Sequence, residues 1–112
     1  MTFLEAVGRM EGFGVPGDRP TRDNDPGDIE YGPFTKAHGA ISSDGRFAIF
    51  PDAATGFAAL HALLTGPAYR GLTVSQAINK YAPPNENNTV NYVNSICRWV
   101  GCKPTDIIDS LL

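Results

Sequence analysis

The sequence is poor in charged residues, in cysteine and histidine, and in long apolar runs. Nine basic residues stand against twelve acidic ones, which gives a formal net charge of −3. A weakly acidic chain lacks the basic surface that binds nucleic-acid phosphates, so we expect no nucleic-acid partner. The most apolar stretch, Phe57 to Leu64, is too short to cross a bilayer, and membrane insertion is not expected.

Two cysteines and two histidines offer little for a metal site. Cys97 and Cys102 match no zinc spacing, and His38 and His61 have no obvious partner ligands. We favour free thiols, because a bridge between such near neighbours would strain the end of a helix. Phosphate-binding glycine loops and nucleophilic serine or cysteine motifs are also lacking, so neither a metal nor a cofactor is expected.

A basic segment followed by an apolar run, the pattern of a signal peptide, does not follow Met1. If the target lies outside the cytoplasm, we expect a holin, a phage particle, a secretion machine or a larger parent chain to deliver the protein. The length of 112 residues and a hydrophobic content of 42% predict one folded domain over residues 1–112.

The first helix is well marked in the sequence. Thr2 and Glu5 have the spacing of a capping box, and Gly12 and Gly14 are typical of a helix end. Glu11 is therefore predicted to lie at a helix C-terminus, where the chain turns.

The next segment, residues 12–40, is rich in Gly, Pro, Asp and Asn and is predicted to be irregular, with strand character only at Asp28–Tyr31. Residues Ala40–Phe50 then predict a β-hairpin. Asp44-Gly45 would form a type I′ turn, and Arg46–Phe50 would be the second strand.

The remaining sequence predicts four helices. Asp52 caps the first, Thr73 and Gln76 form a capping box for the second, and Pro83-Pro84 ends it. The third begins at Asn88 or Thr89 and ends before Gly101. Its predicted buried face consists of Val90, Val93, Cys97 and Val100. A last short helix would begin at Pro104 and run through Leu111. The expected fold is α+β, mostly helical, with a small hairpin region after the first helix.

Glu11 is the candidate for acid chemistry. Apolar neighbours and the negative end of a helix dipole both raise a carboxyl pKa, and glycosidic cleavage needs a carboxylic acid that is still protonated near neutral pH. The alternative is a solvated glutamate at a helix end, and position alone does not decide between them.

Several segments resemble, in order and over nearly the whole chain, a family of phage and prophage proteins often labelled structural or virion proteins. In that family a helix ending in Glu-Gly-Phe precedes an Arg-Asn-Asn-Asn-Pro-Gly-Asn-Ile motif. The segments here are Arg9–Phe13 (RMEGF), Arg22–Ile29 (RDNDPGDI), Phe47–Pro51 (FAIFP), Gly56–Leu60 (GFAAL) and Tyr81–Thr89 (YAPPNENNT) followed by Tyr92-Val93.

The same proteins are similar to lysozymes and lytic transglycosylases, and the resemblance implies a lysozyme-like domain that cleaves peptidoglycan at MurNAc–GlcNAc β-1,4 bonds. It assigns Glu11 as the catalytic general acid and base and Tyr92 as a tyrosine that reaches it. In lytic transglycosylases a Glu-Thr pair precedes that Tyr-Val. Here Glu86 and Thr89 precede it with wider spacing.

The central motif departs from the family pattern, because Asp23, Asp25 and Asp28 replace asparagines and only Asn24 keeps its amide. An ionised aspartate accepts hydrogen bonds from a sugar but cannot donate them. We expect Asp25 or Asp28 to border the substrate groove, with ordinary turn chemistry as the alternative. The candidate substrate-binding residues are Asn24, Asp25, Asp28, Glu30 and Tyr31. Sugar stacking could also involve Phe34, Tyr69, Tyr81 or Trp99.

Two mechanisms and two other functions stay open. A lytic transglycosylase needs one carboxyl group, whereas a muramidase needs a second, from Asp25, Asp28 or Glu30; we lean towards the former. The other possibilities are a non-catalytic virion or wall-binding module and a secreted antibacterial effector with the same chemistry. The expected partner is bacterial peptidoglycan, met in the periplasm or outside the cell by a monomer or by part of a phage particle.

Overall fold

The first helix, α1 (Phe3–Glu11), begins and ends at the predicted residues in the computed structural model, which describes residues 1–112. The Thr2 hydroxyl accepts a hydrogen bond from the Glu5 amide at 3.1 Å, and the Glu5 carboxylate accepts one from the Thr2 amide at 2.9 Å. Gly12 ends the helix in the left-handed conformation, with φ of 97°. Glu11 is thus the last helical residue.

The region predicted to be irregular contains two short helices, α2 (Arg19–Arg22) and α3 (Pro33–Ala37), so that prediction is wrong in part. Both have a proline in the first turn, where the missing N–H would have no helical partner. Asp18-Arg19-Pro20 and Gly32-Pro33 are helix-start signals that the abundance of turn residues obscured.

The hairpin is present but shorter than predicted. β1 (Ser42–Ser43) pairs antiparallel with β2 (Ala48–Ile49), and Ser42 lies opposite Ile49. The predicted type I′ turn is wrong, because Gly45 but not Asp44 has a positive φ. Instead, the Asp44 carboxylate accepts the backbone N–H groups of Arg46 and Phe47 at 3.0 and 2.8 Å. The Asp44 amide also donates to the Phe47 carbonyl at 3.0 Å, so the side chain and the backbone of Asp44 close the turn together.

The second half contains α4 (Ala53–Thr65), α5 (Val74–Tyr81), α6 (Thr89–Val100) and a short 3₁₀ helix, η1 (Ile108–Leu111). The predicted caps are confirmed: the side chains of Asp52, Thr73 and Asn88 accept the amides at the starts of the three α-helices, and Gly101 ends α6. The last helix does not begin at Pro104. Residues 104–107 are instead tied to the start of α5 by backbone hydrogen bonds.

The buried face of α6 differs from the prediction. Val90 is 73% exposed, whereas Thr89 and Tyr92 are buried. Their hydroxyl groups find partners, because Thr89 donates to the Ala82 carbonyl at 2.6 Å and Tyr92 donates to Glu11. A helix can bury polar side chains when each polar atom is hydrogen-bonded, and apolar periodicity alone misses that.

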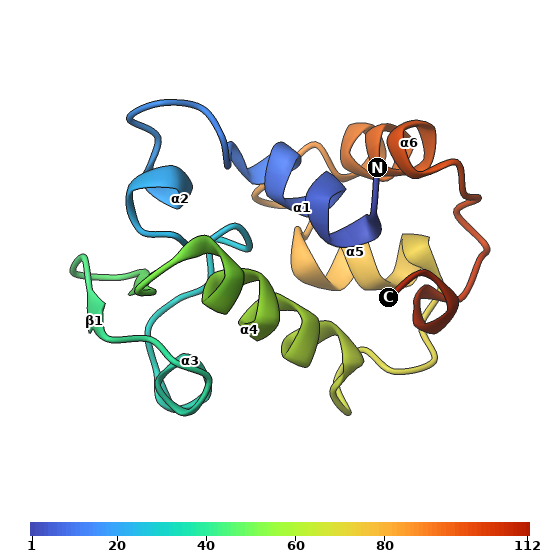
Figure 1. Cartoon of the computed structure of the whole chain (residues 1–112). Helices are drawn as coiled ribbons and strands as arrows, with labels where there is room; N and C mark the ends of the chain where they lie inside the picture. The colour runs from blue at the N-terminus through green and yellow to red at the C-terminus, as the bar shows by residue number, and fades with distance from the viewer.

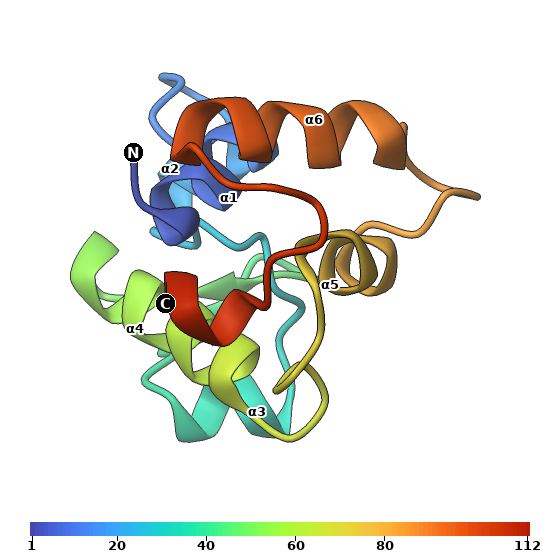
Figure 2. The same ribbon diagram turned by 90° about the vertical axis from the view of Figure 1, so that its right-hand side faces the viewer.

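About half of the chain is helical, and the predicted α+β, mostly helical fold is confirmed. α1 packs mainly on α6, with α5 below α6 and α4 on the other side of α1 (Figures 1 and 2). These helices and η1 enclose the main core, whose buried residues are Phe3, Ala6, Val7, Leu60, Leu64, Tyr69, Val74, Ala77, Ile78, Ala82, Tyr92, Val93, Ile96 and Ile108. None of the helices combines the length and apolar character that a membrane span requires.

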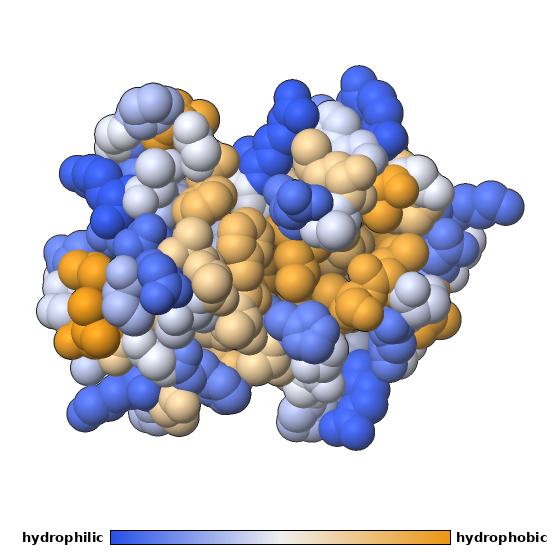
Figure 3. Space-filling model, viewed as in Figure 1, coloured by the Kyte–Doolittle hydropathy of each residue, from blue (hydrophilic) through white to orange (hydrophobic).

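The region from α2 to the hairpin has little apolar packing of its own. Its cluster consists of Ala48, Phe50 and Ala59, the last contributed by α4. On the face seen in Figure 3, apolar surface extends from the middle of the molecule towards the right-hand side, and a separate apolar patch lies at the left edge. Cys97 and Cys102 are free thiols, as predicted, with their sulfur atoms 3.8 Å apart.

Candidate active site

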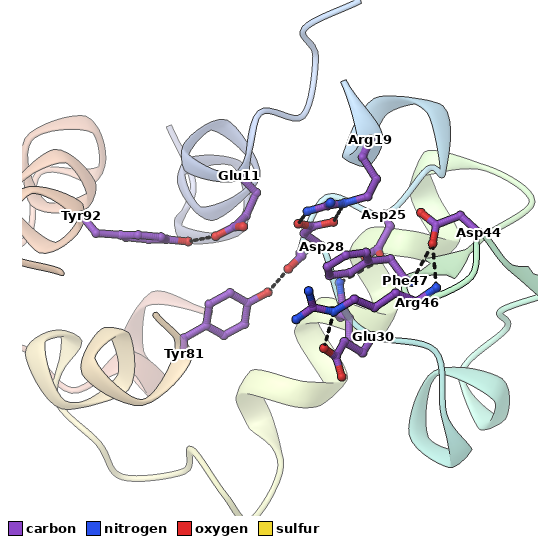
Figure 4. A network of polar contacts seen from close by, with 12 residues as sticks. Glu11, Arg19, Asp25, Asp28, Glu30, Asp44, Arg46, Phe47, Tyr81 and Tyr92 are labelled. Carbon is purple, nitrogen blue, oxygen red and sulfur yellow. Dashed lines mark hydrogen bonds and ion pairs between the residues drawn. The ribbon is translucent and has the colours of Figure 1, made fainter. Parts of the chain in front are cut away.

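Glu11 and Tyr92 meet where α1 crosses α6. The Tyr92 hydroxyl donates a hydrogen bond of 2.8 Å to Glu11 Oε2, and the tyrosine is only 3% exposed (Figure 4). Glu11 itself is half-buried and reaches a cleft. One carboxylate oxygen is therefore held by a rigid donor from the core, and Oε1 has no partner within the chain.

The electrostatic surroundings of Glu11 favour its protonated form. Burial raises the pKa of the Glu11 carboxyl above its ordinary value, and the nearby Asp28 carboxylate raises it further. The hydrogen bond from Tyr92 lowers the pKa, as does the more distant Arg19, but burial has the largest effect. A carboxyl group with a raised pKa at the edge of a cleft is suited to general acid catalysis.

The cleft has a volume of about 230 Å³ and lies between the 27–29 segment and the helical core. Polar and apolar groups both contribute substantially to its walls, and five of the nine lining residues are hydrophobic. The lining residues are Glu11, Gly27, Asp28, Ile29, Leu63, Tyr69, Tyr81, Ala82 and Asn87. Tyr69 and Tyr81, which the sequence offered as candidates for sugar stacking, are therefore in position to contact a ligand beside Glu11.

Asp28 lines the cleft but is not a free carboxylate. Arg19 donates two hydrogen bonds to its carboxylate, from Nε to Oδ1 at 2.9 Å and from Nη2 to Oδ2 at 2.5 Å. The guanidinium carbon of Arg19 also lies 3.7 Å from the centre of the Phe47 ring. Asp28 adopts a left-handed backbone conformation, with φ of 48°, which Asp and Asn tolerate better than most residues. Its side chain is held in place by the two hydrogen bonds from the Arg19 guanidinium group.

Tyr81 joins the two walls of the cleft. Its hydroxyl donates a hydrogen bond to the Gly27 carbonyl across the cavity (Figure 4). A Cβ atom at Gly27 would lie 2.8 Å from that hydroxyl and 2.9 Å from Leu60 Cδ1. Glycine is required here because of this close approach, and the contact fixes the loop that presents Asp28.

Asp25 does not line the cleft. It is fully buried, its Oδ2 accepts the Ile29 amide at 2.9 Å, and its Oδ1 has no partner. Burial raises the pKa of the Asp25 carboxyl to about 7. Of the two aspartates that we expected at the groove, Asp28 borders it, and Asp25 supports the turn from beneath.

Asn24 also faces inward. Its amide donates to the Phe50 carbonyl at 3.2 Å, and its backbone has a φ of 53°. A Cβ atom at Gly56 on α4 would lie 2.0 Å from the Asn24 carbonyl oxygen, so helix and loop are in direct contact here. The structure places this amide in a scaffold role, away from the cleft.

Glu30 and Tyr31 lie on the surface beyond the cleft. Glu30 forms an exposed ion pair with Arg46 at 2.8 Å, and Tyr31 is 37% exposed. Neither lines the cavity beside Glu11. The geometry therefore brings together Glu11, Tyr92 and Asp28 but not the other four residues predicted for the site.

Sequence reasoning missed Arg19 and Asn87. Arg19 lies in the segment predicted to be irregular, and a spacing of nine residues from Asp28 gives no sign of an ion pair. Asn87 is in the Tyr81–Thr89 motif, but no periodicity distinguishes it from its neighbours. His38 stacks on Phe34, with ring centres 4.4 Å apart, and takes no part in the cleft.

Comparison of the chain with models of known protein families and with curated proteins finds no match.

Proposed function

We propose that this protein cleaves the MurNAc–GlcNAc β-1,4 bonds of peptidoglycan, with Glu11 as the general acid and base, in the manner of a lytic transglycosylase. The observation that carries the proposal is the Glu11 carboxyl group itself, which lies at the edge of a cleft with a raised pKa and one oxygen held by Tyr92. The resemblance of the sequence motifs to the lysozyme and lytic transglycosylase superfamily supports the same chemistry.

In this mechanism Glu11 gives its proton to the glycosidic oxygen as the bond to C1 of the MurNAc residue breaks. The carboxylate then takes the proton of the sugar's own C6 hydroxyl, whose oxygen bonds to C1. The product is a 1,6-anhydro sugar, no water is consumed, and Glu11 returns to its protonated state. Tyr92 occupies Oε2 throughout, so Oε1 would carry the proton in both steps.

The choice between transglycosylase and muramidase depends on the second carboxylate. Asp28 is the other carboxylate that lines the cleft, and both of its oxygens are engaged by Arg19. A muramidase needs a carboxylate that is free to activate water or to stabilise the cationic sugar. A doubly bonded Asp28 is poorly suited to that role, which favours the one-carboxylate mechanism.

The test is mass spectrometry of the muropeptides released from purified sacculi. The proposal expects 1,6-anhydro ends. Reducing ends would indicate a muramidase, and absence of release would favour a non-catalytic wall-binding or virion module. Access to the wall would come from a phage particle or a secretion machine.

Glu11→Gln should lower the rate of release by about 10²- to 10⁴-fold, because the amide keeps the shape but cannot act as an acid. Glu86→Gln is the matched control, since Glu86 is exposed and lies outside the cleft lining. Equal rates for wild type and Glu11→Gln would refute the assignment.

A further inference from the structure

A second cavity lies between α5 and α6, beside the segment that joins them. Its volume is about 440 Å³, larger than that of the cleft beside Glu11. Four asparagines contribute to its lining, together with Ser75 on α5 and Val90 on α6, and no charged residue does. The asparagines are Asn79, Asn87, Asn88 and Asn94.

The amide groups of this cavity keep hydrogen-bonding capacity for a ligand. Asn79 donates to the Ser75 carbonyl at 2.8 Å, which leaves its Oδ1 open. The Asn88 Oδ1 accepts the Asn91 amide at 3.1 Å, which leaves its NH₂ group open. The side chain of Asn94, in the middle of α6, makes no hydrogen bond within the chain. The cavity thus offers both donors and acceptors but no charge, which suits a neutral polar ligand.

The cavity and the cleft share a residue. Asn87 lines both of them, so the two cavities are neighbours. Pockets that bind small ligands usually have volumes of about 300–1,000 Å³. The cleft, at about 230 Å³, is below that range, whereas the second cavity, at about 440 Å³, is within it.

We propose that this amide-lined cavity is a second glycan-binding site, which holds an N-acetylated sugar of the same strand that Glu11 cleaves. The inference deepens the proposed function and depends on it for the identity of the polymer. An acetamido group has one N–H donor and one carbonyl acceptor, which match the open Asn79 and Asn94 atoms. Its methyl group matches Val90, which is 73% exposed.

The experiment is an NMR titration of ¹⁵N-labelled protein with tri-N-acetylchitotriose, in which the side-chain amide signals of the four asparagines are followed. These signals should shift with a single saturating curve. Chitotriose without acetyl groups should bind at least tenfold more weakly. N-acetylalanine methylamide, a peptide with the same acetamido group but no sugar hydroxyls, should bind more weakly, because it offers no hydroxyl to the open Asn88 NH₂ group. If the peptide binds and the acetylated sugar does not, the cavity is not a glycan site.

The double variant Asn79→Ala/Asn94→Ala should bind the acetylated sugar about tenfold more weakly, because each lost hydrogen bond weakens binding several-fold. Both positions are exposed on helices, where alanine favours the fold. Asn91→Ala is the matched control, since Asn91 is an exposed asparagine of α6 outside the cavity lining. Equal affinity of the double variant and wild type would overturn the proposal.

The outcome is independent of the sacculus assay. If anhydro-muropeptides are released but the four asparagine signals do not shift, the second site is wrong and the proposed function stands. If the signals shift and the double variant binds weakly but sacculi are not cleaved, the sugar site stands and the catalytic proposal fails.

Discussion

The two walls of the cleft are built in different ways. The wall that holds Glu11 and Tyr92 belongs to the helical part of the chain, where fourteen buried apolar residues form one core. The opposite wall, with Asp28, belongs to residues 12–52, which contribute only Ala48 and Phe50 to a buried apolar cluster completed by Ala59 of α4. Both ion pairs of the molecule, Arg19–Asp28 and Arg46–Glu30, lie in this second part.

The difference shows how such a site can combine an acid that is placed by apolar packing with a partner that is placed by a charge pair. The side chain of Glu11 is placed by helix packing, which depends little on pH or salt. The side chain of Asp28 is placed by a charge pair whose arginine is 43% exposed, and salt weakens the attraction between charges that solvent reaches. Perturbations of the two parts should therefore have different signatures.

Ile96→Ala should destabilise the helical part of the chain, and it has the largest expected effect. Ile96 is fully buried in the main core, and truncation of such a residue usually lowers the free energy of unfolding by about 2–5 kcal/mol. Urea unfolding measures this loss. Val90→Ala, at an exposed position of the same helix, is the control and should change the free energy by less than about 0.5 kcal/mol. Equal losses would mean that α6 packs differently.

Asp25→Asn tests how a buried acid in residues 12–52 makes the stability of the protein depend on pH. Burial raises the pKa of Asp25 from its ordinary value of 3.8 to about 7, so the folded chain binds this proton more tightly than the unfolded chain. Its contribution to stability is therefore greatest below about pH 4 and is lost as the pH rises to about 7. Asp23, whose pKa burial raises to about 6, acts in the same direction.

The amide cannot ionise, so Asp25→Asn should flatten the dependence of the unfolding free energy on pH between 4 and 8, as measured by urea titrations. Asp18→Asn, at an exposed cap residue whose side chain makes no capping bond, is the control and should leave the slope unchanged. A variant with the wild-type slope would show that Asp25 is not the group responsible.

Tyr92→Phe tests the contact between α1 and α6. Loss of the hydrogen bond that stabilises the Glu11 carboxylate as it gives up its proton should lower the rate of muropeptide release by about tenfold. The hydrogen bond lowers the pKa of Glu11, so its removal raises that pKa. Activity requires protonated Glu11, and the alkaline limb of the pH–rate profile should move to higher pH. An unmoved limb with full activity would mean that Tyr92 only packs in the core.

Asp28→Asn should move the same limb in the opposite direction. The Asp28 carboxylate raises the pKa of Glu11, and Arg19, released from its partner, lowers it. Glu11 then loses its proton at lower pH, and the alkaline limb moves to lower pH by a smaller amount. Glu30→Gln, which removes the exposed ion pair outside the cleft, is the control. Movement to higher pH would show that Asp28 does not act on Glu11 through its charge.

The sequence predicted the helical part better than the polar part, for a physical reason. Helix caps and apolar periodicity are local, so Thr2, Asp52, Thr73 and Gly101 were placed correctly. The ion-pair partners in the other part are nine and sixteen residues apart in the sequence. The Arg19–Asp28 pair, with Arg19 stacked on Phe47, and the burial of Asp25 are tertiary features, and neither has a local signal.

Glycine at position 56 limits how the sequence can vary. Any side chain there would meet the Asn24 carbonyl at 2.0 Å and Pro26 Cδ at 2.8 Å, and would separate α4 from the loop that carries Asp28. Gly32, by contrast, has open space around its Cα and an extended backbone with φ of −177°. Random mutagenesis followed by selection for activity should therefore leave Gly56 invariant while Gly32 accumulates substitutions. The contact at position 56 couples sequence changes in α4 to sequence changes in the loop of the motif, so the two segments would have to change together.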